Sequence, residues 1–455
     1  MPFALDDTIA AIATPAGEAG LAVVRVSGPR AIALADEVFR GRAPLRQAGG
    51  NTLHHGWLGG EARIDEVVAA LFRAPASYTR EDVVEISCHG GALPARRTLE
   101  RLLAVGARAA EPGEFTLRAF LNGRLDLVQA EAVAELIHAR SDRMHRAALS
   151  RLAGELSAEL RARLEALADL LAEVEARVDF AEDVGGIEVP AGVIARIVAE
   201  RAALASHLAG AAWARALREG VQVAIVGRPN AGKSSLFNRL VGEERAIVTP
   251  VPGTTRDRVS ATIELEGALF TLSDTAGLRV AGDPIEAEGV ARARRALEAS
   301  HVVLWVVDGT TAASAAERDE MAALAGRRVV LALNQRDRGA HAGAASRLEG
   351  LGAERAEAVG VSALTGEGVA DVATALARVA GFEAGEVLAS ERQSATLARA
   401  CAALERAARE ADHGAPGEIV ALELREALGA LEELLGVRVS DDLLERIFAR
   451  FCVGK

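Results

Sequence analysis

The sequence has little cysteine and no long apolar run. Its three cysteines lie far apart without CxxC spacing, which argues against a disulfide scaffold or a zinc site and favours a reducing compartment. No stretch approaches eighteen consecutive apolar residues. The acidic pair Asp6 and Asp7 stands where a secretory signal would be basic and then apolar. We therefore expect a cytoplasmic protein that does not enter a membrane.

An excess of basic residues is also absent. Lys and Arg total 52 against 64 for Asp and Glu, which gives a formal net charge of -12. The chain as a whole therefore does not attract polyanions, and any nucleic acid must be recognised locally or with the help of a partner. We interpret the arginine clusters at 96–101, 140–146 and 292–295 as solvated helix faces.

The length of 455 residues exceeds what one hydrophobic core supports. Short β-branched runs between glycines and prolines predict an α/β domain over residues 1–120. Leu and Val residues from 149 to 178 recur at helical spacing and predict one long helix of a bundle, so 121–217 is assigned to a helical domain. Strands and helices alternate over 218–380, as in a parallel sheet covered by helices. A leucine- and alanine-rich helical pattern returns over 381–455. Because the same pattern lies on both sides of the α/β segment, we infer one helical domain interrupted by an inserted module.

The inserted module opens with a phosphate-binding pattern. A strand-like run over 221–227 leads into GxxxxGKS, from Gly227 to Ser234, and then into a helical stretch. Glycines let the backbone N–H groups approach phosphate oxygens at a helix N-terminus. Lys233 is expected to reach the β- and γ-phosphates, and the Ser234 hydroxyl to bind Mg²⁺. A glycine-rich turn without a ligand is the alternative, but the strand and helix on either side favour a phosphate loop.

Two further elements stand at the spacing of nucleotide switches. GTTRD at 253–257 places Thr255 to bind Mg²⁺ when a γ-phosphate is present, and DTAG at 274–277 ends a strand-like run. Asp274 is expected opposite Ser234 at Mg²⁺, with the Gly277 amide at the γ-phosphate.

Two more elements predict guanine as the base. NQRD at 334–337 places the Asp337 carboxylate to accept two hydrogen bonds from guanine, which adenine cannot donate. VSAL at 361–364 brings the backbone of Ser362 and Ala363 near the guanine oxygen. The superfamily pattern is NKxD, and Gln335 replaces its lysine, so we expect weaker affinity with specificity retained. The predicted GTP-binding residues are Asn230, Ala231, Gly232, Lys233, Ser234, Ser235, Thr249, Pro250, Val251, Pro252, Gly253, Thr254, Thr255, Asp274, Thr275, Ala276, Gly277, Asn334, Asp337, Ser362 and Ala363.

The glutamine that orients water in Ras-like enzymes is missing. Leu278 follows DTAG and cannot polarise water. Two groups remain as candidates to complete catalysis beside Lys233. Asn230 in the phosphate loop can bind a monovalent cation that neutralises developing charge. An acidic stretch around Glu286 can position the attacking water.

With these elements the chain resembles the MnmE (TrmE) family of tRNA-modification GTPases along essentially its whole length. The most specific motifs lie outside the GTPase module: GEFTLRAFLNGRLDLVQAEAV at 113–133 and the C-terminal FCVGK at 451–455. The implied fold is a folate-binding-like α/β domain, a helical domain and an inserted Ras-like P-loop GTPase domain.

The resemblance also implies site residues. It places K⁺ between the Asn230 side chain and the carbonyls of Thr249, Val251 and Thr254, and it makes Glu286 the residue that orients water. The first domain becomes a folate-binding and dimer-forming domain. Its matching positions are Arg25, Glu85, Arg124, where the family pattern has lysine, and Lys455. For Cys452 two interpretations stay open: a terminal packing cysteine, or a group near folate that takes part in the chemistry.

The function implied by the resemblance is modification of the wobble uridine of certain tRNAs at carbon 5. The implied partners are tRNA, a second copy of the chain and the flavoprotein MnmG in a heterotetramer. The implied cofactors are Mg²⁺, K⁺ and 5,10-methylene- or 5-formyl-tetrahydrofolate. One alternative is a ribosome-assembly switch of the Era or Der kind, although a single GTPase module argues against Der and the lack of a basic GxxG-bearing C-terminal domain argues against Era. Another is a folate-binding protein in which GTP serves only assembly.

Overall fold

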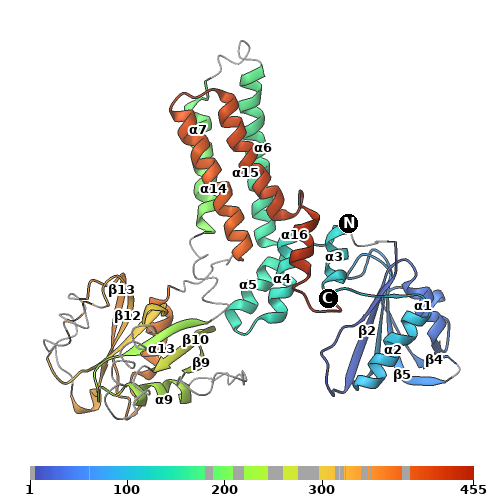
Figure 1. Cartoon of the computed structure of the whole chain (residues 1–455), viewed down its shortest axis with the longest axis horizontal. Helices are drawn as coiled ribbons and strands as arrows, with labels where there is room; N and C mark the ends of the chain where they lie inside the picture. Colours follow the sequence, from blue (N-terminus) through green and yellow to red (C-terminus); the bar gives the residue numbers. More distant parts are fainter. Residues whose placement is uncertain are drawn as a thin grey trace, which may run out of the picture. The chain divides into compact units, whose positions relative to one another are not determined.

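The computed structural model divides the chain into two compact units, one of residues 1–138, 148–205 and 395–455 and one of residues 139–147 and 206–394. The predicted domain boundaries stay predictions, because compactness separates only these two units. The structure describes residues 6–60, 62–179, 188–208, 220–243, 260–274, 297–312, 317, 322, 324–339, 347, 351–381 and 390–455 (Figure 1). Among these residues, no helix is both long enough and apolar enough to cross a membrane.

The N-terminal part of the first unit is a seven-stranded sheet with helices on one face. The strand order is β3-β4-β5-β6-β2-β1-β7, and all neighbours are antiparallel except β1 and β7. The strands are β1 Ile9–Ile12, β2 Leu21–Ser27, β3 Phe39–Gly41, β4 Thr52–Gly59, β5 Arg63–Phe72, β6 Val83–His89 and β7 Arg108–Ala109. Helices α1 (Ala31–Val38) and α2 (Ala92–Ala104) pack on one face and complete its core. A short 3-10 helix, η1, spans Leu45–Gln47.

The register of this sheet places polar residues on its other face. Arg25 of β2 pairs with Glu85 of β6, and Val24 and Ile86, which are fully buried, point into the core. Because side chains alternate along a strand, Arg25 and Glu85 lie together on the face away from α1 and α2.

Three further helices and the C-terminus pack beside this sheet. They are α3 (Glu114–Leu121), α4 (Leu127–His138) and α16 (Asp441–Phe448), which share a core that contains Phe448 and Phe451. The first unit thus brings the two family motifs, which residues 134–450 separate in sequence, into one core.

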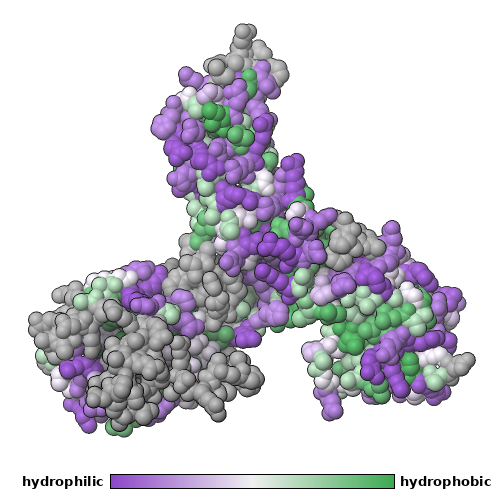
Figure 2. Space-filling model, viewed as in Figure 1, coloured by the Kyte–Doolittle hydropathy of each residue, from purple (hydrophilic) through white to green (hydrophobic). Residues whose placement is uncertain are grey.

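The remaining helices of the first unit form a bundle. They are α6 (Glu155–Asp179), α7 (Ala191–Ser206), α14 (Glu391–Asp412) and α15 (Gly417–Leu435), drawn side by side in Figure 1. Buried leucines such as Leu160 and Leu167 lie inside, while hydrophilic residues predominate over the bundle on the face shown in Figure 2. Buried members of the predicted stripe, such as Leu156 and Val174, therefore face a core, whereas Leu149 at its start is 48% exposed.

The prediction of one long helix from residue 149 to 178 is wrong. Helix α5 (Asp142–Ala153) ends before Gly154, and α6 begins at Glu155. Gly154 has a φ of 90°, a left-handed conformation that glycine adopts without steric cost and that ends a helix. The Gln129 side chain donates to the carbonyl of Leu152 at 3.1 Å and satisfies the end of α5. Helical periodicity continued across the break because a single glycine shifts it very little.

The second unit contains a six-stranded sheet of order β13-β12-β11-β8-β10-β9, parallel except for β9 against β10. The strands are β8 Val221–Val226, β9 Ser260–Leu265, β10 Ala268–Asp274, β11 Val302–Asp308, β12 Arg328–Asn334 and β13 Arg355–Gly360. Helices α9 (Lys233–Glu243) and α13 (Val369–Val379) cover one face, and a 3-10 helix, η2, spans Arg336–Arg338. The valine-rich strands are buried on both faces, as parallel strands require.

Candidate functional site

The phosphate loop joins the central strand β8 to helix α9, and its glycines are required by close packing. A Cβ on Gly227 would lie 2.1 Å from the carbonyl oxygen of Val306, and one on Gly232 would lie 2.0 Å from Nδ2 of Asn334. Both glycines have positive φ angles, 140° and 92°. Only glycine fits at these two positions. The loop is thereby held against β11 and β12, with the N-terminus of α9 at its end.

Three side chains at this loop are the candidates for phosphate and cation binding. Lys233 is 94% buried, with 6% of its surface exposed, and its ammonium donates to the carbonyls of Gly227 and Arg228, each at 2.7 Å. Asn230 is exposed and has a φ of 62°, a left-handed conformation that asparagine tolerates better than most residues. Ser234 is exposed in the first turn of α9. A hydroxyl and an amide oxygen suit hard cations such as Mg²⁺ and K⁺.

Asn334 links the phosphate loop to the guanine elements. Its Nδ2 donates to the carbonyl of Ala231 at 2.7 Å, and its Oδ1 accepts from the amide of Ala363 at 2.9 Å. The Ser362 hydroxyl donates to Oδ1 of the exposed Asp337 at 2.6 Å. Arg239 of α9 donates from Nη2 to the carbonyl of Leu364 at 2.7 Å. NQRD and VSAL, 27 residues apart, therefore form one rim beside the phosphate loop, the predicted guanine rim.

Gln335 stands in a left-handed conformation with a φ of 67° at the end of β12. Its Oε1 accepts a hydrogen bond of 3.2 Å from Nη1 of Arg338. A lysine at this position would have no acceptor for Arg338. The departure from NKxD therefore comes with a local partner for the amide.

Several predicted residues lie outside the described residues: Thr249, Pro250, Val251, Pro252, Gly253, Thr254, Thr255, Thr275, Ala276, Gly277, Leu278 and Glu286. Asp274 ends β10, where its backbone is paired with Ile225 of β8, two residues before Gly227. That register brings the start of DTAG to the same end of the parallel strands as the phosphate loop. The roles of all these residues stay predictions.

A second cluster of predicted residues lies on the open face of the N-terminal sheet. The Arg25 guanidinium donates to Oε1 of Glu85 at 2.8 Å and to the carbonyl oxygen of Gly454 at 3.1 Å. Burial lowers the pKa of Lys455, and the nearby positive charge of Arg25 lowers it further. The structure thus brings Arg25, Glu85 and the C-terminal Lys455 together, although 370 residues separate the last two.

The C-terminal tail is fixed at this cluster. A Cβ on Gly454 would lie 2.6 Å from the carbonyl oxygen of Ile12, so glycine is required there. The amide of Gly113 donates to the carbonyl oxygen of Cys452 at 3.4 Å. The Cys452 side chain is exposed, which does not fit a packing cysteine and leaves the thiol accessible.

Tyr78 and Arg118 were missed by the sequence analysis. The ring of Tyr78 lies 5.3 Å from the Arg25 guanidinium and 4.7 Å from that of Arg124. Tyr78 is the chain's only tyrosine, a signal that could have drawn attention to it. Arg118 lies within the family motif at 113–133, but nothing in sequence distinguishes a buried arginine from an exposed one.

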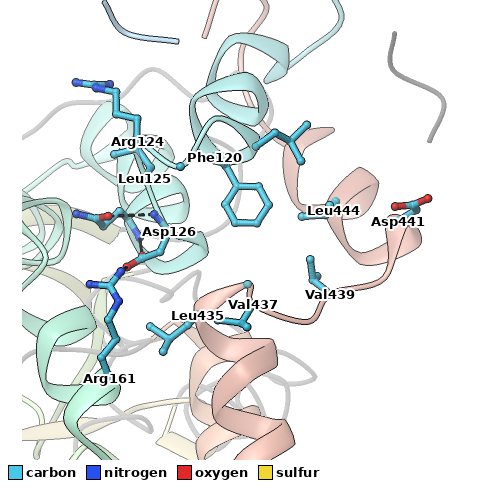
Figure 3. A pocket seen from close by; sticks show the side chains of 14 residues that line it. Phe120, Arg124, Leu125, Asp126, Arg161, Leu435, Val437, Val439, Asp441 and Leu444 are labelled. Atoms are coloured by element: carbon cyan, nitrogen blue, oxygen red, sulfur yellow. Dashed lines mark hydrogen bonds and ion pairs between the residues drawn. The ribbon is translucent and has the colours of Figure 1, made fainter. Parts of the chain in front are cut away.

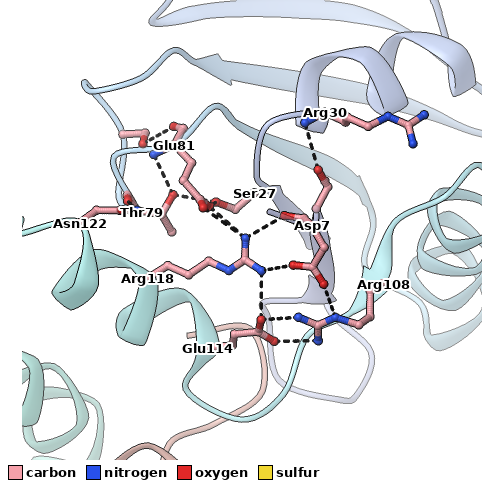
Figure 4. A network of polar contacts seen from close by, with 11 residues as sticks. Asp7, Ser27, Arg30, Thr79, Glu81, Arg108, Glu114, Arg118 and Asn122 are labelled. Atoms are coloured by element: carbon pink, nitrogen blue, oxygen red, sulfur yellow. Dashed lines mark hydrogen bonds and ion pairs between the residues drawn. The ribbon is translucent and has the colours of Figure 1, made fainter. Parts of the chain in front are cut away.

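Arg118 is the centre of a buried charged network (Figure 4). It is 1% exposed, and it bonds to Glu114 at 3.1 Å, to Asp7 at 2.5 Å and to Glu81 at 3.2 Å. Burial alone would raise the pKa of Glu114, but hydrogen bonds from Arg108, the backbone of Glu111 and Arg118 lower it overall. These contacts join α3 to the start of β1 and to the loop after Tyr78.

A pocket of about 480 Å³ adjoins Arg124 (Figure 3). Phe120, Leu435 and Leu444 contribute apolar walls, and Arg161 forms an ion pair of 2.6 Å with Asp126 at its side. In Figure 3 the Arg124 side chain points away from the labelled apolar residues. Arg124 nevertheless belongs to the lining of this pocket, whereas Arg25 and Glu85 do not.

The sheet, the glycine-bounded phosphate loop and the guanine rim define a P-loop GTPase domain, within a chain that also has an N-terminal α/β domain and a helical bundle. Residues 8–124 match the family model for the GTP-binding protein TrmE N-terminus, and residues 127–452 match that for the MnmE helical domain. The chain belongs to the MnmE family of tRNA modification GTPases. The predicted family, fold class and GTPase assignment are confirmed.

Curated relatives agree over the whole chain. The tRNA modification GTPase MnmE of Symbiobacterium thermophilum is 46% identical, over 99% of this chain and 100% of its own length. The protein of the same name from Moorella thermoacetica is 44% identical, over 99% and 100%. Among solved structures, the G domain of the T. maritima FeoB iron transporter is 26% identical over 35% of this chain and 98% of its own, with a TM-score of 0.27.

Proposed function

We propose that this protein is a potassium-stimulated GTPase that acts with MnmG on the wobble uridine of certain tRNAs. Together they would install the aminomethyl or carboxymethylaminomethyl group at carbon 5, with a one-carbon unit from folate. The observation that carries the proposal is the full-length similarity to proteins named tRNA modification GTPase MnmE. The ribosome-assembly alternative has no comparable support outside the GTPase domain.

In the proposed GTPase cycle, Lys233 and the loop amides bind the phosphates, and Ser234, Thr255 and Asp274 hold Mg²⁺. Asp337 reads guanine. Bound Mg²⁺ neutralises charge on the β- and γ-phosphate oxygens. The exposed position of Ser234 at the start of α9 supports this assignment, because a hydroxyl there faces the phosphates of a loop-bound nucleotide.

Potassium is proposed to replace the missing catalytic charge. Asn230, in a left-handed conformation that exposes its amide on the phosphate loop, supports a role as its side-chain ligand. Carbonyls of Thr249, Val251 and Thr254 would complete the site, and Glu286 would orient the attacking water. K⁺ would supply the positive charge that an arginine finger supplies in other GTPases.

Folate is proposed to bind at Arg25, Glu85, Arg124 and Lys455. The Arg25–Glu85 pair offers a donor and an acceptor side by side, which suits the polar edge of a pterin. The lowered pKa of Lys455 supports an anionic ligand, because a nearby negative charge would offset the cost of burying the ammonium. The exposed thiol of Cys452, three residues away, keeps open a chemical role for this residue.

Homodimerisation is proposed through the open face of the N-terminal sheet. Leu53 and Val68 there are 74% and 38% exposed, and Trp57 is 36% exposed. Alternation along β4 and β5 puts these side chains opposite the buried core face. Large exposed apolar side chains gathered on one sheet face are unusual on a monomer and typical of an interface.

Nucleoside analysis of bulk tRNA tests the proposed function. A strain without this protein should lose carbon-5 aminomethyl and carboxymethylaminomethyl uridine, and the wild-type gene should restore both. Restoration by Glu286→Ala would leave GTP with a role in assembly only, whereas its failure, with nucleotide binding retained, supports coupling to hydrolysis. An unchanged wobble uridine profile, with the protein found on ribosomal particles instead, would overturn the proposal in favour of the ribosome-assembly switch.

A further inference from the structure

Tyr78 lies between the two arginines of the proposed folate site. Its ring centroid is 5.3 Å from the Arg25 guanidinium carbon and 4.7 Å from that of Arg124, within the range of cation–π attraction. Its carbonyl oxygen also accepts a hydrogen bond of 3.1 Å from Nη1 of Arg124. One residue therefore contacts both cations.

The two arginines differ in their charge balance. Arg25 is neutralised by Glu85, with Nη2 and Oε1 2.7 Å apart, and its side chain is only 12% exposed. Arg124 is exposed and forms no ion pair with any residue that the structure describes. Its hydrogen bond and its ring contact both go to Tyr78. Of the two arginines, Arg124 thus carries the unpaired charge, and Tyr78 contacts it.

Tyr78 is itself firmly placed. Its hydroxyl lies 2.9 Å from Oγ1 of the fully buried Thr116. The next residue, Thr79, is also fully buried; its Oγ1 lies 2.6 Å from Oγ of Ser27, and its carbonyl accepts from Nδ2 of Asn122 at 2.7 Å. A ring fixed from both its hydroxyl and its backbone can restrict the rotamers of a long arginine side chain, which otherwise loses entropy on binding.

We propose that Tyr78 is a positioning residue that presents Arg124 to the carboxylate tail of folate. Selectivity for glutamate-bearing folates over pterins without that tail would depend on it. The chemistry fits because the neutral Arg25–Glu85 pair suits a polar heterocycle, whereas an unpaired guanidinium binds carboxylates in a bidentate manner. The proposal rests on the folate site of the proposed function and adds the residue that sets its selectivity.

Isothermal titration of the full-length protein tests this with two probes: 5-formyl-tetrahydrofolate, and 5-formyl-tetrahydropteroate, which lacks the glutamate. Tyr78→Leu and Arg124→Ala are each expected to weaken binding of the first probe about tenfold and to leave the second unchanged. The double variant should bind no worse than either single variant, since both remove one interaction. Tyr78→Phe keeps the ring and should bind both probes nearly as the wild type does.

Arg96→Ala, an exposed arginine of α2 that pairs with Glu100, is the matched control and should change neither affinity. If Tyr78→Leu loses thermal stability, Tyr78→Met, closer in volume, takes its place. Wild-type affinity of the Tyr78 variant for both probes would overturn the proposal, and so would an equal loss for both, since that indicates a general scaffold role. A wild-type protein that binds neither probe would overturn the folate site itself and this proposal with it.

Discussion

The side-chain amide of Asn334 donates to the carbonyl oxygen of Ala231 at 2.7 Å, a contact across 103 residues. The same side chain accepts from the amide of Ala363 at 2.9 Å, and it is only 3% exposed. A single buried amide therefore fixes the phosphate loop against the guanine rim, so that one nucleotide can contact both.

Asn334→Ala should weaken GDP binding at least tenfold. Each buried group left without its partner costs about 1–3 kcal/mol, and the two elements would no longer be held in register. Titration of a fluorescent GDP analogue measures this. Arg378→Ala, which removes a surface ion pair with Glu357 in the same unit, serves as the control. Affinity of the Asn334 variant within twofold of wild type would contradict the linking role.

Gln335→Lys should tighten nucleotide binding several-fold and leave the preference for GDP over ADP unchanged. The lysine stem is longer than that of Gln and can cover more of the purine, while the proposed base specificity comes from Asp337. The left-handed backbone at this position is equally unfavourable for both residues. Competition titrations with GDP and ADP measure the two affinities. A lower nucleotide affinity of the lysine variant would mean that the Gln335–Arg338 hydrogen bond contributes more to binding than the longer lysine stem does.

Hydrolysis of GTP should be faster in KCl than in NaCl at equal ionic strength, and Asn230→Ala should remove most of the difference. The amide oxygen is the proposed side-chain ligand of K⁺, while the proposed phosphate contacts of Lys233 do not depend on it. Phosphate release in each salt, with GDP affinity measured in parallel, separates catalysis from binding. Equal rates for the wild type in both salts would exclude the cation mechanism.

Arg118→Met should lower the free energy of unfolding by about 3–5 kcal/mol at neutral pH. It removes a buried cation from three carboxylates: Glu81 loses its ion pair, and Asp7 and Glu114 keep only Arg108. The pKa values of Asp7 and Glu114 lie below their ordinary values. The network therefore stabilises the fold fully when the pH is above the ordinary pKa values of these carboxyl groups. Its contribution is lost as the pH falls through the folded-state pKa values, below about 4. The difference between variant and wild type should therefore shrink in acid.

Urea unfolding at pH 7 and at about pH 3.5, where the carboxyl groups of the unfolded chain begin to be protonated, measures this dependence. Arg96→Ala breaks only an exposed ion pair and should change stability by less than about 1 kcal/mol at either pH. A deficit of Arg118→Met that is equal at both values would show that packing, and not charge, is what Arg118 contributes.

Val68→Glu should shift the protein from dimer to monomer. Val68 lies on the open sheet face opposite His55, and a carboxylate at this position would have to be desolvated in the proposed interface. Light scattering after size-exclusion chromatography reports the mass. Leu422→Glu replaces a 63% exposed leucine of α15 and should leave the mass unchanged. A Val68 variant that stays dimeric would show that the dimer interface does not include this sheet face.

The sequence alone determined the GTPase domain. The strands from 221–226, 302–307 and 328–334 were recognised because buried parallel strands are continuous apolar runs, and the phosphate loop because its glycines and lysine have fixed spacing. Each of these signals lies within a short stretch of sequence, so it can be recognised without knowledge of the fold. The helix break at Gly154 was missed because one residue in a left-handed conformation does not interrupt an apolar stripe.

Only the tertiary structure decided which residues from distant segments contact one another. Only folding brings Lys455 to Arg25, places Tyr78 between Arg25 and Arg124, and buries Arg118 among three carboxylates. No spacing in sequence encodes these contacts, because they arise from strand register and from the packing of the C-terminus against α3. An arginine looks the same in a sequence whether water or a carboxylate surrounds it, and only its burial separates the two.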